Sequence, residues 1–199
     1  MTTAENHYPD THHDDYSKTT FGFWVYLLSD LMFFATLFAA YAVLSKNTFG
    51  GPTQKEIFSL PYATIETLML LAAAFTAGLG GALTHRKSKG GAITFFLITF
   101  VLGLFFLPML HHEYSHIFAL GYSWKSNAFL SMYFTLTGTL ALHVIIGLLW
   151  TLVLLPPVFK QGITPLYLKR LSCLRIFWQF INIVWVFIFT FVYLLGVIS

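Results

Sequence analysis

Five long apolar segments constrain the fold of this chain more than any other feature of its sequence. A helix needs about 20 predominantly apolar residues to cross the hydrocarbon core of a bilayer. The segments near residues 21–44, 61–83, 92–111, 127–155 and 174–198 reach that length. Because an isolated segment in lipid can satisfy its backbone hydrogen bonds only as a helix, we expect an all-α membrane protein built as a five-transmembrane-helix bundle.

The composition supports the same class of protein. Charged residues make up 10% of the chain, whereas about 25% is typical of a soluble domain. The single cysteine, Cys173, excludes an intrachain disulfide and a thiolate cluster. The formal net charge of +3 does not indicate nucleic-acid binding, because Lys and Arg fall mainly in the short links between apolar segments. We expect a polar tail at residues 1–20 and a membrane domain at residues 21–199.

The positions of Lys and Arg predict the orientation in the membrane. Cytoplasmic flanks of membrane helices carry an excess of these two residues. One side of the expected bundle carries eight of them: Lys18, Arg86, Lys87, Lys89, Lys160, Lys169, Arg170 and Arg175. The other side carries three, which are Lys46, Lys55 and Lys125. We therefore expect a cytoplasmic N-terminus and a periplasmic C-terminus.

Glycine and proline mark the expected links between the spans. Gly-Gly-Pro stands at 50–52, Lys-Gly-Gly at 89–91, and a pair of prolines at 156–157. We predict that a helix ends at or near each of these positions, because glycine and proline both weaken a continuing helix.

The N-terminal tail is polar and rich in histidine and aspartate: His7, Asp10, His12, His13, Asp14 and Asp15. Imidazole titrates near neutral pH, so this cluster offers proton buffering or adventitious metal binding as alternatives. Low hydrophobicity is more typical of a solvated, disordered segment, and we interpret the tail in that way. It has no apolar stretch of the kind that a cleavable signal peptide requires.

The stretch HEYSH at 112–116 fits the H-E-x-x-H pattern, in which two histidines bind zinc and the glutamate acts as general base. An intramembrane metalloprotease built on it would need a third protein ligand. No Asp or Glu follows Glu113, and the one later histidine, His143, is expected midway along the fourth span. We predict no metal site here, and we place His112 and Glu113 at the headgroup boundary.

One carboxylate, Asp30, is expected about nine residues, or roughly 13 Å, inside the first span. An ionisable group at this depth is costly and is a functional candidate by default. Two interpretations stay open: a buried acid bonded to a neighbouring helix, or a site for protons or lipid. Glu66 lies near the outer end of the second span, where a structural role is more typical. His143 lacks the second mid-membrane histidine that a low-spin haem would need, which favours a packing role.

Four stretches form a specific pattern: FGFWVYLLSD at 21–30, GGPTQKEIFSLPYATIET at 50–67, GTLALHV at 138–144 and FWQFINIVWVFIFTFVYLLG at 177–196. Together, in their order and spacing, they resemble subunit III of the haem–copper oxidases, and within it the branch of the bacterial bo-type ubiquinol oxidases. Five spans, where mitochondrial subunit III has seven, are similar to that branch. So are Glu66 and the GGPT loop.

This resemblance implies an accessory subunit in the bacterial inner membrane, with no active site of its own. The complex would reduce oxygen to water and export protons, with haems and copper in the partner catalytic subunit and none in this chain. The implied partners are oxidase subunits I and II, a small subunit IV, and bound phospholipid. Asp30 falls where the family has its membrane-embedded carboxylate, which lies by a lipid-filled cleft and is linked to sustained proton uptake.

The last helix departs from the family pattern in an informative way. Where the family has W-H-F-x-D-x-x-W, residues 178–185 carry Gln179 and Asn182 at the two titratable positions. In the family's G-x-H-G-L-H-V, the first histidine has become Leu140, while His143 is kept. The two amides lie on one helix face and can hydrogen-bond, but they cannot carry charge. We expect structural polar roles for Glu66, Glu113, His143, Gln179 and Asn182.

Three rival functions differ in how closely they fit. Subunit III of a cytochrome c oxidase is the nearest alternative, and the intramembrane metalloprotease is a distant one. A small transporter would show more than one mid-membrane polar cluster and often internal symmetry, and the sequence shows neither.

Overall fold

The computed structural model describes residues 11–47, 52 and 54–198, and all regular structure within these ranges is helical. The elements are α1 (Thr11–Leu44), α2 (Gln54–Ile57), α3 (Leu60–His85), α4 (Lys89–Ala119), α5 (Ala128–Gln161), α6 (Pro165–Ile188), the π-helical η1 (Phe189–Leu194) and α7 (Leu195–Ile198). Since α6, η1 and α7 follow one another without a break, they form one rod. Among the described residues, five helices are long and apolar enough to cross a membrane, which confirms the predicted fold class.

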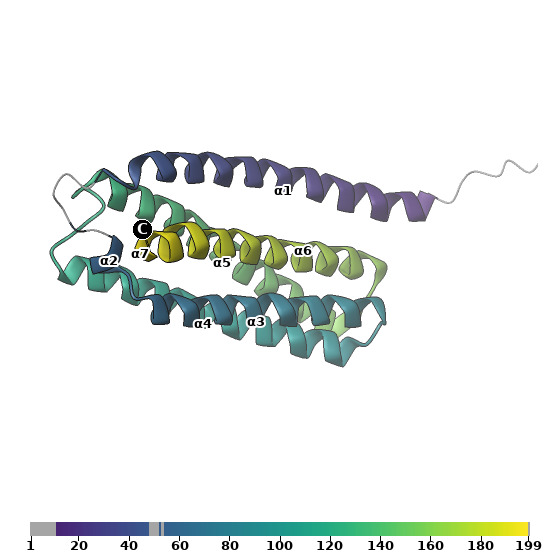
Figure 1. Cartoon of the computed structure of the whole chain (residues 1–199). Helices are drawn as coiled ribbons and strands as arrows, with labels where there is room; N and C mark the ends of the chain where they lie inside the picture. The colour runs from purple at the N-terminus through teal and green to yellow at the C-terminus, as the bar shows by residue number, and fades with distance from the viewer. Residues whose placement is uncertain (1–10, 48–51, 53, 199) are drawn as a thin grey trace, which may run out of the picture.

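The five long helices lie side by side along a common axis (Figure 1). α1 begins at one end of the bundle, and α7 ends at the other. The end that holds α7, α2 and the start of α3 is called the C-terminal end below. The opposite end holds the α3–α4 and α5–α6 links with Arg86, Lys87 and Lys160, and is called the basic end. Which end faces the cytoplasm stays a prediction from the charges.

The helices differ in how much protein surrounds them. α3 packs most extensively on α4 and also on α6, while α5 contacts α4, α6 and α1. α1 packs mainly against α5 and α6. In its most apolar stretch 17% of the residues are buried, against 44% in the α6–α7 rod. α1 is therefore a peripheral helix, and much of its surface faces away from the rest of the chain.

Aromatic side chains fill the core between α4, α5 and α6. Trp178, Trp185 and Phe106 are fully buried, and the rings of Phe106 and Trp185 meet edge-on with centroids 4.9 Å apart. Gly103 on α4 makes room for the Trp178 ring of α6, because a Cβ at that position would lie 2.6 Å from the ring. The tight contact keeps α4 and α6 in a fixed register.

The wide π-helical turn η1 interrupts the regular α-helix of the last rod. A π segment accommodates one extra residue in a helical path and is frequent at functional sites. Val192 and Tyr193 are buried there, whereas Phe191 is exposed. The turn therefore directs the Tyr193 phenol into the core.

Two of the predicted turns prove to be helical. α5 continues through Pro156-Pro157 to Gln161 and ends at Gly162, whose φ of 79° suits glycine. Each proline lacks a backbone N–H, so α5 loses two backbone hydrogen bonds at this point. Ending the helix within lipid would free more backbone groups, each of which would need a partner. Residues 89–91 form the first turn of α4. The residues at 50–51 lie outside the described residues.

The actual turn between α3 and α4 lies at residues 86–88. Lys87 adopts a left-handed conformation with φ 57°. Ser88 N–H donates to the Leu83 carbonyl at 3.0 Å and Lys87 N–H to the Thr84 carbonyl at 3.0 Å. These are the two hydrogen bonds of a Schellman cap, which glycine usually completes; here a lysine does so, and sequence reasoning missed it.

Besides α5, three helices extend well beyond their predicted spans. α4 continues eight residues past His111 to Ala119 and ends at Gly121, with φ 83°. α6 begins at Pro165, behind the capping hydroxyl of Thr164, instead of at residue 174. α1 begins at Thr11, so the expected disorder is wrong for residues 11–20, while residues 1–10 lie outside the described residues. Hydropathy marks the lipid-embedded part of a helix, whereas caps decide where it ends.

Candidate functional site

Asp30 faces His143 near the middle of the bundle. Asp30 lies midway along α1 and His143 midway along α5, two helices in direct contact. The Asp30 Oδ2 atom is 3.6 Å from His143 Nε2. The Asp30 side chain is 18% exposed and that of His143 10% exposed. The structure thus brings together the acid and the histidine that the sequence placed separately near mid-membrane.

The hydrogen bond at Nδ1 of His143 determines whether its other ring nitrogen, Nε2, donates or accepts. Nδ1 lies 2.9 Å from the carbonyl oxygen of Thr139. Since a carbonyl oxygen only accepts, Nδ1 carries a hydrogen and donates it. In a neutral imidazole the other nitrogen, Nε2, is then an acceptor. An ionised Asp30 facing that lone pair would be repelled, so the two groups interact favourably only when one proton lies between them.

With that proton in place, the pair is electrically neutral in either arrangement. Protonated Asp30 can face neutral His143, or the carboxylate can face the imidazolium. A neutral pair avoids most of the cost that an isolated charge incurs at membrane depth. This geometry explains how an acid is tolerated within the apolar first span.

Aromatic rings fix the position of His143. The Phe34 ring centroid is 5.2 Å from the imidazole, and the Phe177 ring stacks on it at 6.3 Å. Phe34 is itself buried on α1, one turn after Asp30. On the outer side, the half-exposed Tyr26 lies within electrostatic reach of the Asp30 carboxyl. Asp30 therefore lies between an ordered aromatic interior and the exposed surface of α1.

Glu66 and Glu113 both lie inside the bundle; that Glu113 lies at the level of the headgroups stays a prediction from the sequence. Glu66 on α3 is fully buried and Glu113 on α4 is 8% exposed. Tyr193 Oη donates to Glu113 Oε2 at 2.8 Å, and the hydroxyls of Tyr193 and Tyr133 lie 3.1 Å apart. The sequence could not have identified these phenols as partners, because they lie 60 positions apart on separate helices.

The HEYSH stretch lies within α4, with His112 and His116 exposed and Glu113 turned inward to Tyr193. Over residues 11–47, 52 and 54–198, no group of three His, Cys, Asp or Glu side chains is arranged to hold a metal ion. A glutamate bonded to a buried phenol is poorly placed as the general base of a metalloprotease. The arrangement gives that alternative no support.

The two amides of the last helix lie at the α3–α6 contact, where they line an open pocket of about 330 Å³. Gln179 Nε2 donates to the Ala74 carbonyl at 2.8 Å. Gly78 makes room for it, since a Cβ there would lie 3.3 Å from Nε2. Within the described part of the chain, the buried Oδ1 of Asn182 has no hydrogen-bond partner. Gln179 thus contributes to helix packing without a charge.

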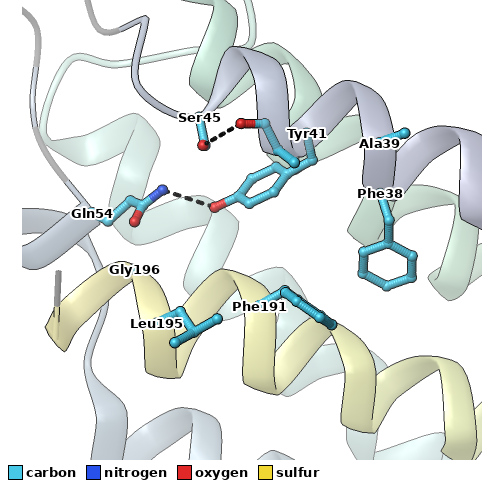
Figure 2. Close-up of a pocket in the computed structure, with 9 residues that line it drawn as sticks. Phe38, Ala39, Tyr41, Ser45, Gln54, Phe191, Leu195 and Gly196 are labelled. Atoms are coloured by element: carbon cyan, nitrogen blue, oxygen red, sulfur yellow. Dashed lines mark hydrogen bonds between the residues drawn. The ribbon is translucent and has the colours of Figure 1, made fainter.

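A pocket of about 420 Å³ opens at the C-terminal end between α1, α2 and the end of the last rod (Figure 2). Its walls are apolar, with Phe38, Phe191 and Leu195. Its polar rim holds Tyr41, whose Oη accepts from Gln54 Nε2 at 3.0 Å. Sequence analysis missed this pocket, because Gln54 lies in a link and Tyr41 reads as one more aromatic residue of the span.

Comparison with known proteins identifies close relatives. The sequence model of one family, cytochrome c oxidase subunit III, matches residues 2–197. Cytochrome bo(3) ubiquinol oxidase subunit 3 of Pseudomonas aeruginosa is 46% identical over 190 residues, which cover 96% of this chain and 91% of the relative. Quinol oxidase subunit 3 of Bacillus subtilis is 36% identical, covering 88% and 86%. Cytochrome c oxidase subunit 3 of Bacillus sp. (strain PS3) is 36% identical, covering 89% and 86%.

Proposed function

Because the chain belongs to the cytochrome c oxidase subunit III family, we propose that it is the non-catalytic subunit III of a bacterial bo-type quinol oxidase. It is a multi-pass protein of the bacterial inner membrane and forms a complex with other oxidase subunits. That complex reduces oxygen to water and exports protons. The higher identity to relatives named ubiquinol oxidase than to the one named cytochrome c oxidase supports the quinol branch.

The Asp30–His143 pair carries the functional part of the proposal. One proton on either group makes the pair neutral. At 3.6 Å the Oδ2 and Nε2 atoms lie just beyond hydrogen-bond distance, and the buried Oδ2 has no hydrogen-bond partner among the described residues, so a small movement is enough to bring the two groups into contact. Without that proton the pair carries one negative charge, so taking up a proton neutralises the pair and passing the proton on restores the charge. We assign Asp30 to sustained proton uptake by the complex, with His143 as its positioning base.

The partners follow from the family. Subunits I and II and a small subunit IV complete the complex, and the haems and copper reside in the catalytic subunit. A phospholipid occupies the pocket between α1 and the last rod, where Phe38 and Phe191 suit an acyl chain and the Tyr41–Gln54 rim suits a polar headgroup.

The test is Asp30→Asn in the purified, reconstituted complex. Asparagine keeps the shape but cannot share a proton with His143, so assembly and haem content should match the wild type. Proton uptake should fall, and activity should decline sooner during continuous turnover. Ser29→Ala is the matched control, because the Ser29 hydroxyl bonds only to its own helix at the Val25 carbonyl. Equal durability of Asp30→Asn and wild type would remove Asp30 from the proposal.

The assignment as a quinol oxidase subunit has a separate test, gentle purification of the tagged chain. Co-purification with a large subunit carrying b- and o-type haem supports it. A partner subunit with a dinuclear copper site would instead indicate a cytochrome c oxidase. Isolation as a stable, solitary chain would contradict both assignments.

A further inference from the structure

Glu66 and Glu113 enter the core at the same depth from adjacent helices. Glu66 lies six residues after α3 begins at Leu60, and Glu113 lies six residues before α4 ends at Ala119. At 1.5 Å per residue, each lies about 9 Å along its helix from the helix terminus at the C-terminal end of the bundle. α3 and α4, which carry them, form the most extensive helix–helix contact among the described residues.

Glu66 is an unusual buried group. Its side chain is fully enclosed, and neither carboxyl oxygen has a hydrogen-bond partner among the described residues. Nearby, Thr67 accepts from Trp185 Nε1 at 3.0 Å, so that potential donor on α6 is already engaged. An ionised carboxylate without donors is strongly disfavoured in such surroundings. Glu66 is therefore suited to hold a proton.

Glu113 has the opposite surroundings. Its Oε2 accepts from Tyr193 at 2.8 Å, and Tyr193 is in turn in contact with the Tyr133 hydroxyl. Hydrogen bonds from phenols stabilise a carboxylate charge. Glu113 also lines a pocket of about 150 Å³ with Tyr62, His112 and His116, and both histidines are exposed. This side chain is suited to bear the charge and to meet water.

Titratable groups on α3, α4, α5 and η1 interact electrostatically with the pair or line its pocket. They are Tyr62 on α3, His112, Tyr114 and His116 on α4, Tyr133 on α5, and Tyr193 on η1. The Tyr62 and Tyr114 hydroxyls are bonded elsewhere, to the Met109 carbonyl at 3.0 Å and to Thr137 at 2.8 Å. In the described part of the chain, no Lys or Arg forms an ion pair with either carboxyl group. A negative charge on the pair is therefore not neutralised by a basic side chain.

We propose that Glu66 and Glu113 form a proton-binding site, separate from Asp30–His143, in which the two carboxyl groups share one proton and exchange it with water at the C-terminal end. A hydronium ion in the pocket gives its proton to the Glu113 carboxylate and leaves as water; when Glu66 is ionised, the proton passes on to it, and release follows the reverse path. The pair then carries one negative charge, held by the Tyr193 hydrogen bond. This inference does not depend on the oxidase assignment.

Infrared spectroscopy of the whole complex tests the site. At neutral pH the wild type should show the C=O stretch of a protonated carboxyl group, and D₂O should shift it because the pocket allows exchange. Glu66→Gln should abolish the band. Glu113→Gln should keep the band but move it, since the neighbouring charge is gone. Asp30→Asn is the control that separates the two acid sites and should leave this band in place.

Several outcomes would overturn the proposal. They are a wild-type complex without the band, a band that survives Glu66→Gln, and a band that D₂O does not shift. Because Glu66→Gln can fail to assemble, a second measurement uses the wild type. Labelling the glutamate carboxyl carbons with ¹³C should lower the frequency of the band, whereas the same label in aspartate should leave it in place. A band that responds only to the aspartate label would contradict the assignment.

Discussion

The bundle holds two sites with a buried acid: in one the acid lies opposite a histidine, and in the other it lies near a second acid. Asp30 lies on the peripheral helix α1 and faces a base, so one proton makes the pair neutral. Glu66 lies in the interior and faces another acid, so one proton still leaves a charge, which two phenols then stabilise. The comparison teaches that the partner across the helix contact, more than depth, decides which protonation state a buried acid adopts.

The largest expected effect comes from removing the base. His143→Leu leaves Asp30 opposite an apolar side chain, and breaking a buried pair in this way costs about 3–5 kcal/mol. Thermal dissociation of the subunit from the purified complex should therefore occur at a clearly lower temperature. The double variant Asp30→Asn/His143→Leu should recover most of the loss. If it is no more stable than the single variant, the two side chains are not energetically coupled.

The second largest loss of stability is expected from removing the Tyr193 hydroxyl, which donates to Glu113. Tyr193→Phe removes the donor to Glu113 and leaves that acid without its recorded hydrogen bond, at a cost of about 1–3 kcal/mol. The same dissociation assay measures this loss. Tyr167→Phe is the matched control, because Tyr167 makes only a long 3.4 Å bond to the exposed Gln161 side chain. Equal effects of both substitutions would show that Glu113 does not rely on Tyr193.

A smaller effect on stability is expected at Gln179, an amide at a position where the family has a titratable residue. Gln179→Leu removes the bond to the Ala74 carbonyl, worth about 0.5–1.5 kcal/mol. Assembly should weaken slightly, while turnover and its durability stay at the wild-type level. A turnover defect as large as that of Asp30→Asn would show that proton handling extends beyond the two acid sites.

The smallest effect concerns the pocket beside α1. Gln54→Ala removes the amide that donates to Tyr41 and opens the polar rim. Lipid analysis of the purified complex should show loss of one tightly bound phospholipid, with a stability change of about 1 kcal/mol or less. Thr64→Ala, whose hydroxyl bonds only to its own helix, is the control. Unchanged lipid content in Gln54→Ala would remove the pocket as the lipid site.

Hydropathy alone predicted the five spans, since the cost of exposing polar backbone in lipid leaves few alternatives. It also singled out Asp30. It could not pair Asp30 with His143, because that contact joins residues more than a hundred positions apart. It could not show that Glu113 turns inward to Tyr193, because apolarity falls near residue 111 while α4 continues to Ala119, just before Gly121. Burial depends on the neighbours that a helix acquires, and these appear only in three dimensions.

The wide turn η1 has a consequence for the register of the last rod. Without its extra residue the path would be a regular α-helix of 3.6 residues per turn, and every later side chain would rotate by about 100° around the axis. The Tyr193 phenol would then leave the Glu113 carboxyl, although no residue touching that acid had changed. Deletion of one residue within η1 before Tyr193, between Phe189 and Val192, would thus disconnect the inner acid site from a distance along the chain.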